Sequence, residues 1–103
     1  MKKAYLFLAT GFEETEAIGT VDILRRAGID AKIVSIMNDK KVCGAHGIPV
    51  TADALIGELD YCDADALILP GGMPGASNLN NCAPLKKLLT EQYEQKRLVA
   101  AIC

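Results

Sequence analysis

The sequence predicts an α/β protein built on a doubly wound, mostly parallel sheet. Four short, nearly continuous apolar runs, at residues 3–9, 31–36, 66–69 and 98–102, are typical of strands buried on both faces. Segments with helical periodicity lie between the first and second runs and between the third and fourth. Because parallel neighbours require crossover connections, this alternation favours a sheet with helices on its two faces.

Length and composition limit the class of protein. The 103 residues suit one domain, and a hydrophobic fraction of 50% excludes a disordered chain. The net charge of −2 makes nucleic acid and an anionic membrane poor candidates for a partner. The longest apolar run, residues 4–9, is far shorter than the roughly 20 residues that span a bilayer. No signal-cleavage pattern follows it, so a cytoplasmic location is expected.

The first helix is expected directly after the strand at residues 3–9. Thr10 and Glu13 match the S/T-x-x-E capping pattern, and the helix dipole favours the glutamates of the first turn, Glu13, Glu14 and Glu16. The basic residues Arg25 and Arg26, followed by Gly28, are typical of the end of a helix. The predicted core-facing side consists of Ala17, Val21, Leu24 and Ala27.

The middle of the chain is predicted to leave the regular alternation. After the strand at residues 31–36, two short extended pieces at residues 42–43 and 48–51 suit a small hairpin. Residues 53–59 can form a short helix that Asp53 would cap.

The second long helix is expected after the strand at residues 66–69 and its glycine-rich turn. Asn80 or Asn81 would begin it, with Pro84 in the first turn, where proline is well tolerated. Its apolar stripe would consist of Leu85, Leu88, Leu89 and Tyr93. The last strand lacks the crossover helix that should follow it, so residues 1–103 are expected to be the amino-terminal part of a single domain. A complementary carboxyl-terminal fragment is therefore a candidate partner.

The cysteines and the single histidine predict no metal site. Cys43, Cys62, Cys82 and Cys103 include no C-x-x-C pair, and His46 has no second ligand at metal-binding spacing. In a chain without a secretory signal the thiols are expected to be reduced. The first three cysteines are interpreted as structural or incidental, and His46 as a surface or subunit contact. No metal ion or other cofactor is expected.

Three segments that could carry chemistry are predicted to meet at one edge of the sheet. Residues 11–16 follow the first strand, residues 70–75 follow the third, and Cys103 ends the last. Ligands of open parallel sheets bind at the carboxyl ends of the strands. This edge is therefore the expected site.

Cys103 stands where a nucleophile elbow would place a reactive side chain. A thiol at the tip of a buried strand that enters a helix would have its pKa lowered by the helix dipole. The alternative is a small apolar residue that completes a strand, since free cysteines are commonly buried and inert.

The glutamates of the first turn could tune this thiol. On a helical wheel Glu13 and Glu16 fall on the apolar side, whereas Glu14 projects toward the flank. Desolvation raises the pKa of a carboxyl, and a protonated glutamate beside Cys103 would donate a hydrogen bond that favours the thiolate. Solvated glutamates that only stabilise the helix dipole are the alternative. The spacing does not choose between Glu13 and Glu16.

The turn at residues 70–75 (Pro-Gly-Gly-Met-Pro-Gly) leaves backbone N–H groups free. Such groups can stabilise a developing oxyanion, and a glycine-rich turn after a strand can equally bind phosphate. The turn lacks the G-x-G-x-x-G and P-loop patterns, so a nucleotide is weakly supported. A simple turn is the third interpretation.

Together, four stretches resemble the DJ-1/ThiJ/PfpI superfamily, on the branch of the parkinsonism-associated protein deglycase and its bacterial relatives. They are residues 11–17 (GFEETEA), 24–29 (LRRAGI), 69–75 (LPGGMPG) and 99–103 (VAAIC). The resemblance follows the whole chain in order and corresponds to the amino-terminal half of the family's domain.

The resemblance implies a flavodoxin-like sandwich, of the class I glutamine amidotransferase type, that forms homodimers. It assigns Cys103 to the nucleophile elbow and Glu16, rather than Glu13, to the protonated glutamate that hydrogen-bonds the thiol. It assigns Gly72 to a backbone donor of the oxyanion site. The family's second donor, which follows the cysteine, and its downstream histidine are not in this sequence.

The resemblance also implies a function. Members of the family are described as cofactor-free glyoxalases, as deglycases that act on early aldehyde adducts, and as oxidation sensors or chaperones whose cysteine oxidises to sulfinic acid. The expected function is cysteine-dependent removal of reactive aldehydes such as methylglyoxal, with a small aldehyde or a glycated protein as substrate. A redox sensor or chaperone, a PfpI-type cysteine peptidase and a flavodoxin-type flavin binder are the alternatives.

Overall fold

A five-stranded sheet, in which every neighbouring pair is parallel, forms the centre of the computed structural model, which describes residues 1–103. Its strand order is β5-β2-β1-β6-β7. The strands are β1 (Lys3–Leu8), β2 (Asp30–Ser35), β5 (Ala54–Leu55), β6 (Ala66–Leu69) and β7 (Leu98–Ala101). The order reverses at β1, so the predicted doubly wound parallel sheet is confirmed.

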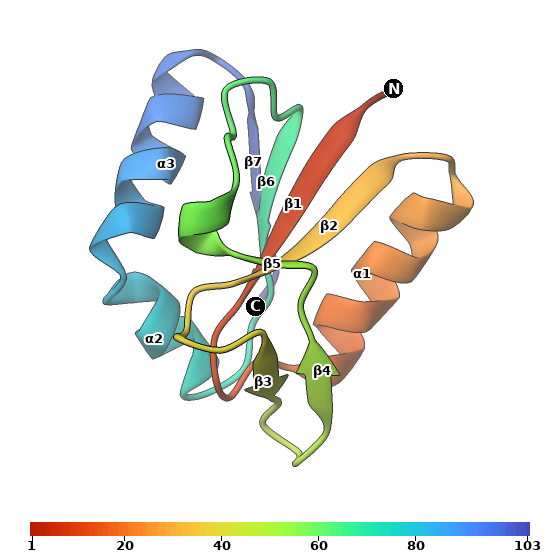
Figure 1. The fold of residues 1–103 in the computed structure, drawn as a ribbon, viewed down its shortest axis with the longest axis vertical. Coiled ribbons are helices and arrows are strands. Elements are labelled where there is room, and N and C mark those ends of the chain that lie inside the picture. Colours follow the sequence, from red (N-terminus) through yellow and green to blue (C-terminus); the bar gives the residue numbers. More distant parts are fainter.

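Helices cover both faces of this sheet (Figure 1). Helix α1 (Glu14–Arg26) lies on one side, and α2 (Gly75–Asn80) and α3 (Ala83–Glu94) lie on the other. The hairpin of β3 (Lys41–Cys43) and β4 (Pro49–Thr51) is separate from the sheet, as predicted. Figure 1 shows the carboxyl terminus near the centre of the view, above the β3–β4 hairpin.

Strand β1 is buried on both faces, as its continuous apolar run predicts. Leu6 and Leu8 pack in the cluster that contains the buried side of α1, whereas Tyr5 and Phe7 pack in the cluster on the side of α2 and α3. Successive side chains of a strand point to opposite faces, which explains this division. Phe7 and Leu8 are fully buried.

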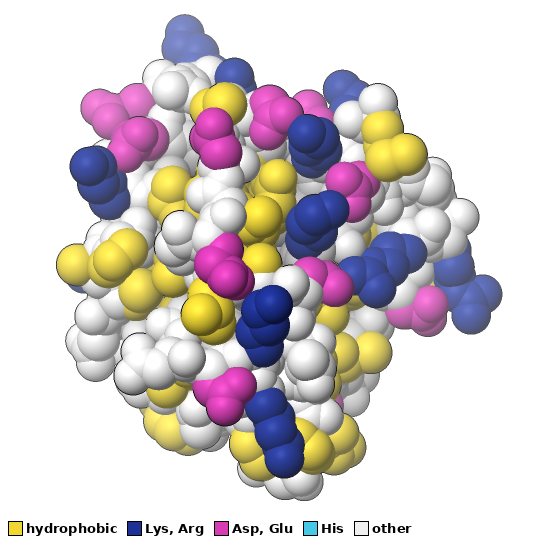
Figure 2. Space-filling view, in the orientation of Figure 1, with side chains coloured by type: hydrophobic (Ala, Val, Ile, Leu, Met, Phe, Trp, Pro, Cys, Tyr) yellow, Lys and Arg dark blue, Asp and Glu magenta, His cyan; other side chains and the backbone are white.

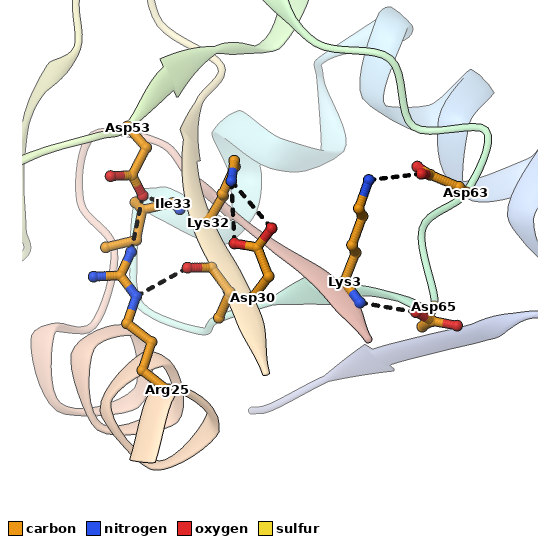
Figure 3. Close-up of polar contacts among 9 residues, drawn as sticks. Lys3, Arg25, Asp30, Lys32, Ile33, Asp53, Asp63 and Asp65 are labelled. Carbon is orange, nitrogen blue, oxygen red and sulfur yellow. Dashed lines mark hydrogen bonds and ion pairs between the residues drawn. The ribbon is translucent and has the colours of Figure 1, made fainter. Parts of the chain in front are cut away.

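Polar contacts among the sheet strands, α1 and the intervening loops fix their relative positions (Figure 3). The Asp53 carboxylate accepts hydrogen bonds from the Ile33 backbone N–H at 2.8 Å and from the Arg25 guanidinium at 3.0 Å. At the start of β1, Lys3 binds Asp65 through its N–H at 2.8 Å and Asp63 through its ammonium group at 2.7 Å. These contacts tie α1 and the loop before β6 to the central strands.

The helix predicted at residues 53–59 is wrong. Residues 54 and 55 pair with β2 as strand β5, and only a single 3₁₀ turn, Ile56–Glu58, follows. Asp53 does not cap a helix, because its carboxylate is bound to β2 and α1 instead.

The boundaries of the other helices differ from prediction in three places. Glu13, not Thr10, caps α1, and its carboxylate accepts from the Thr15 N–H at 3.2 Å. Helix α2 was not predicted, because it is short and begins inside the glycine-rich turn. Helix α3 begins after Cys82 rather than at Asn80 or Asn81, which belong to the end of α2 and its cap.

Two positions of the predicted apolar faces are exposed. Ala27 lies at the exposed end of α1, and the Tyr93 side of α3 faces solvent, with 77% of that residue exposed. Gln92 takes the buried place beside it, and its amide donates hydrogen bonds to the carbonyls of Ala64 and Leu98 at 3.1 and 3.2 Å. The core at this point is therefore closed by a hydrogen-bonded amide, which an apolar pattern does not detect.

None of the helices is both long and apolar enough to cross a membrane. On the face drawn in Figure 2, acidic and basic side chains are interspersed. This distribution agrees with the small net charge of −2.

Candidate functional site

The three segments expected to carry chemistry meet at the carboxyl ends of β1, β6 and β7. The Glu13 N–H donates to the Gly71 carbonyl at 2.8 Å, and the Gly71 N–H donates to Glu16 Oε1 at 2.8 Å. The Ile102 N–H donates to the Leu69 carbonyl at 3.1 Å. The start of α1, the glycine-rich turn and the end of β7 are thus joined by hydrogen bonds.

Cys103 lies directly against Glu16. Its Sγ atom donates to Glu16 Oε2 at 2.8 Å, so the structure places Glu16, rather than Glu13, against the thiol. Cys103 has φ = 55°, in the left-handed region that non-glycine residues rarely occupy. The side chain is exposed. A positive φ is one feature of a nucleophile elbow, and the assignment of Cys103 to such an elbow stays a prediction.

The neighbouring carboxylates oppose ionisation of this thiol. The hydrogen bond to Glu16 and the charge of Glu16 raise the pKa of Cys103, and burial and Glu13 add to the increase. The 2.8 Å contact is short enough for a proton to pass between sulfur and oxygen. The protonated state expected for Glu16 stays a prediction.

Gly71 and Gly72 provide the space for this arrangement. A Cβ at Gly71 would lie 2.6 Å from Glu16 Oε1 and 2.7 Å from the Cys103 Cβ. Gly72 has φ = 102°, and a Cβ there would overlap the Glu13 backbone nitrogen. Any larger residue at either position would displace the first turn of α1 or the cysteine.

The Gly72 N–H donates to no other group of the chain. Gly72 directly follows Gly71, whose own N–H is bound to Glu16. A free backbone N–H is the kind of donor that stabilises an oxyanion, so the role expected for Gly72 stays a prediction.

Cys103 also borders a groove of about 400 Å³ between α2, α3 and the end of β7. Most of its lining is apolar, including Leu79, Leu85 and Leu89, with Lys86 and Thr90 as polar members. The thiol is therefore next to a largely apolar surface.

A second polar cluster, between Glu14 and His46, was missed by the sequence analysis. Glu14 is only 8% exposed, and its Oε1 lies 2.9 Å from the His46 Nδ1 atom. The helical wheel placed Glu14 on the flank of α1, but the β3–β4 hairpin covers that flank. His46 was expected at the surface or in a subunit contact. Its side chain is 67% exposed, but its ring is bound to Glu14 within the chain.

The charges of this cluster stabilise one another. Burial alone would raise the pKa of Glu14. Hydrogen bonds from the His46 ring and from the backbone N–H groups of Glu14, His46 and Ile48 outweigh this effect and hold the pKa at about 2. The same ring contact, with the charges of Glu13 and Glu14, raises the pKa of His46. The ligand atoms of Glu13, Glu14 and His46 lie within 4.8 Å of one another, but the Glu14 oxygens already accept hydrogen bonds, so we assign no metal to them.

The remaining cysteines lie apart from the site and form no disulfide. Cys43 and Cys62 are exposed, Cys82 is half-buried, and all are free thiols. A neighbouring Asp60 raises the pKa of Cys62, mainly through a hydrogen bond, which disfavours its thiolate.

The fold and the site define a class of protein: a flavodoxin-like α/β sandwich with a paired thiol and carboxylate at the carboxyl ends of its parallel strands. Within this class, the chain belongs to the DJ-1/PfpI family, whose match spans residues 2–103.

Individual relatives support this assignment. Protein DJ-1 homolog B of Arabidopsis thaliana is 41% identical over 102 residues, which cover 99% of this chain and 23% of the plant protein. A deglycase of Thermococcus kodakarensis is 32% identical over 102 residues, 98% of this chain and 60% of the archaeal protein. The structure of oxidized Toxoplasma gondii DJ-1 shares 36% identity at a TM-score of 0.97, over 100% of this chain and 56% of that one. The chain thus spans less than two thirds of the length of each relative.

Proposed function

We propose that the protein acts on reactive aldehydes, as a glyoxalase or deglycase with Cys103 as its nucleophile. The observation that carries this proposal is the 2.8 Å contact between Cys103 Sγ and Glu16 Oε2. A thiol that is hydrogen-bonded to a carboxylate has a base in place to take its proton as it attacks a carbonyl. The similarity to an archaeal deglycase supports the same chemistry.

The groups of the site account for each atom in the first step. The Cys103 sulfur adds to the aldehyde carbon while its proton passes to Glu16, and the C=O π electrons move to the oxygen. The free Gly72 N–H is available to stabilise that oxyanion. The proton returns from Glu16 to the oxygen, and the product is a hemithioacetal. Methylglyoxal or an early adduct of it on a protein is the proposed substrate class.

The proposal extends to the assembly. Ile18 and Ile23 of α1 are 39% and 63% exposed, and Ile102 is 43% exposed. We propose that the protein forms a cytoplasmic homodimer, in which a second copy of the chain covers these exposed isoleucine side chains. Residues 1–103 would be the amino-terminal part of one domain, and the rest of that domain, on the same or a complementary chain, would cover the groove beside Cys103.

Lactate formation from methylglyoxal, followed by NMR, tests the enzymatic proposal. Cys103→Ser and Glu16→Gln should each lower the rate by about 10²-fold or more, because each removes a participant in the addition step. Cys62→Ser, which alters an exposed thiol away from the site, is the matched control. Unchanged lactate formation in Cys103→Ser and Glu16→Gln would rule out this mechanism.

The second candidate function is a redox sensor, which the exposure of the Cys103 thiol favours. A sensor should gain oxygen selectively at Cys103 after mild peroxide treatment, as measured by mass spectrometry, and should show no aldehyde turnover. Equal oxidation of Cys43 and Cys103 would argue against it, since both thiols are exposed and a sensor requires oxidation that is selective for Cys103.

A further inference from the structure

The three glutamates at the start of α1 make different main contacts, although Glu13 Oε2 also lies 3.7 Å from the His46 Nδ1 atom that binds Glu14. Glu16 contacts the thiol of Cys103, and Glu13 caps the helix. Glu14 points instead into the loop of residues 44–48, which joins β3 to β4. Its Oε2 accepts from the backbone N–H groups of His46 at 2.8 Å and Ile48 at 3.2 Å. The chemistry proposed above makes no use of this buried carboxylate.

The loop is shaped around the Glu14 carboxylate. Gly44 is buried, and a Cβ at this position would overlap the Glu14 carboxyl carbon and Oε2. Backbone hydrogen bonds hold the loop in this form, from the Gly44 N–H to the Ile48 carbonyl at 2.9 Å and from the Gly47 N–H to the Gly44 carbonyl at 3.1 Å. Glycine at residue 44 therefore leaves the space that the carboxylate fills.

The first turn of α1 is held from two sides. On one side the hairpin binds the preceding segment, through the Gly11 N–H to the Cys43 carbonyl at 2.9 Å and the Ala45 N–H to the Phe12 carbonyl at 2.8 Å. On the other side Gly71 receives the Glu13 N–H and donates to Glu16. Glu14 is the side chain of α1 that hydrogen-bonds to the hairpin loop.

We propose that Glu14 is a positioning residue, which fixes the first turn of α1 to the 44–48 loop and thereby directs Glu16 toward Cys103. Residues 14 and 16 are two positions apart in a helix of 3.6 residues per turn, so they project from nearly opposite sides. A contact that fixes Glu14 on one side of the turn therefore also sets the direction in which Glu16 points on the other side. The inference rests on the proposed function, because it assigns Glu14 a role in the Cys103–Glu16 pair.

The pH dependence of Cys103 alkylation by iodoacetamide, resolved by mass spectrometry, measures this role. Glu16→Gln should lower the midpoint, because the Glu16 carboxylate opposes the thiolate. Glu14→Ala should move the midpoint toward the Glu16→Gln value. Adding Glu14→Ala to Glu16→Gln should cause no further shift, since both act through one carboxylate.

Two further variants separate positioning from general destabilisation. Glu14→Gln should restore most of the wild-type midpoint, because an amide oxygen can accept the two backbone N–H groups and its NH₂ can donate to the other imidazole tautomer. Gly44→Ala should act like Glu14→Ala, because the added methyl group displaces the carboxylate without changing it. Gly57→Ala is the matched control, as a Cβ there meets nothing within 4 Å.

The proposal is overturned if Glu14→Ala lowers the melting temperature but leaves the alkylation midpoint at its wild-type value. If that variant does not fold, His46→Ala carries the test. It removes one of the three hydrogen bonds at an exposed position, and a smaller shift in the same direction is expected. An unchanged midpoint in His46→Ala would then overturn the proposal. Retained lactate formation in Cys103→Ser would contradict the proposed function alone, because alkylation does not depend on turnover.

Discussion

The Sγ atom of Cys103 lies 2.8 Å from Oε2 of Glu16, although the two residues are 87 positions apart in the sequence. The contact forms because the first turn of α1 and the end of β7 meet at the same edge of a parallel sheet, with β6 and its glycine-rich turn between them. The chemistry of the thiol therefore depends on the position of one helix turn.

The hydrogen bond between these two side chains leads to a prediction for Cys103 reactivity. Glu16→Gln removes the group that contributes most to the raised pKa of Cys103, so alkylation at pH 7 should become faster. Iodoacetamide labelling with mass spectrometry measures the rate. Glu91→Gln, on an exposed position of α3, is the control and should label like wild type. A slower reaction in Glu16→Gln would instead indicate that the carboxyl donates its proton to a thiolate.

A second prediction concerns the packing at Gly71. In Gly71→Ala the added Cβ would approach Glu16 Oε1 and the Cys103 Cβ within 2.7 Å, so the pair must separate. We expect a stability loss of about 1–3 kcal/mol and loss of most aldehyde turnover. Urea unfolding and the lactate assay check the two effects.

Gly19 offers the matched control for this substitution. It lies within α1, and a Cβ there meets nothing within 4 Å. Gly19→Ala should therefore stabilise the protein, by about 0.5–1 kcal/mol, because alanine favours the helix. Equal losses of stability in the two variants would contradict a specific clash at Gly71.

The contact between Glu14 and His46 predicts how stability depends on pH. The pKa of Glu14 is depressed from its ordinary 4.5 to about 2, so its contribution is present above pH 4.5 and is lost as the pH falls toward 2. The pKa of His46 is raised from 6.5, so its contribution is complete below pH 6.5 and is lost as the pH rises through the folded-state value. The combined contribution should be largest between pH 4.5 and 6.5.

Urea unfolding of wild type and His46→Gln across pH 3–9 measures this window. His46 is the only histidine of the chain, so its ring proton signals report its titration without overlap. The difference in stability between the two proteins should shrink as the pH rises above the folded pKa of His46. A difference that stays constant up to pH 9 would show that the charge of the ring does not contribute.

The sequence predicts the parts of this molecule that follow from local periodicity. The continuous apolar run of β1 and the carboxyl-end positions of residues 11–16, 70–75 and 103 predicted the sheet and the edge at which these segments meet. The burial of Glu14 could not be predicted in the same way. A helical wheel describes one helix alone, whereas a hairpin more than 25 residues away supplies the donors for this carboxylate.

Glycine spacing contained part of the missing signal. Gly44 and Gly47 bracket His46 in the sequence, and a glycine can mark a close approach by another group. That Gly44 is buried and has no positive φ is seen only in the structure. The sequence does not say which group approaches, because the Glu14 carboxylate enters from α1. Asp53 was misassigned for a similar reason: an acidic residue before a short segment resembles a helix cap until its long-range partners Arg25 and Ile33 are known.

The last prediction concerns Gln92 and Tyr93, whose roles in α3 are the reverse of what the apolar pattern indicates. Gln92 is 4% exposed and donates to the carbonyls of Ala64 and Leu98, whereas Tyr93 is 77% exposed. Gln92→Ala should cost about 1–3 kcal/mol, because it leaves a buried carbonyl without a donor. Tyr93→Ala should change stability by less than about 0.5 kcal/mol, as is usual for an exposed side chain. Urea unfolding of the two variants compares them directly, and a larger loss in Tyr93→Ala would mean that tyrosine is covered in the assembled protein.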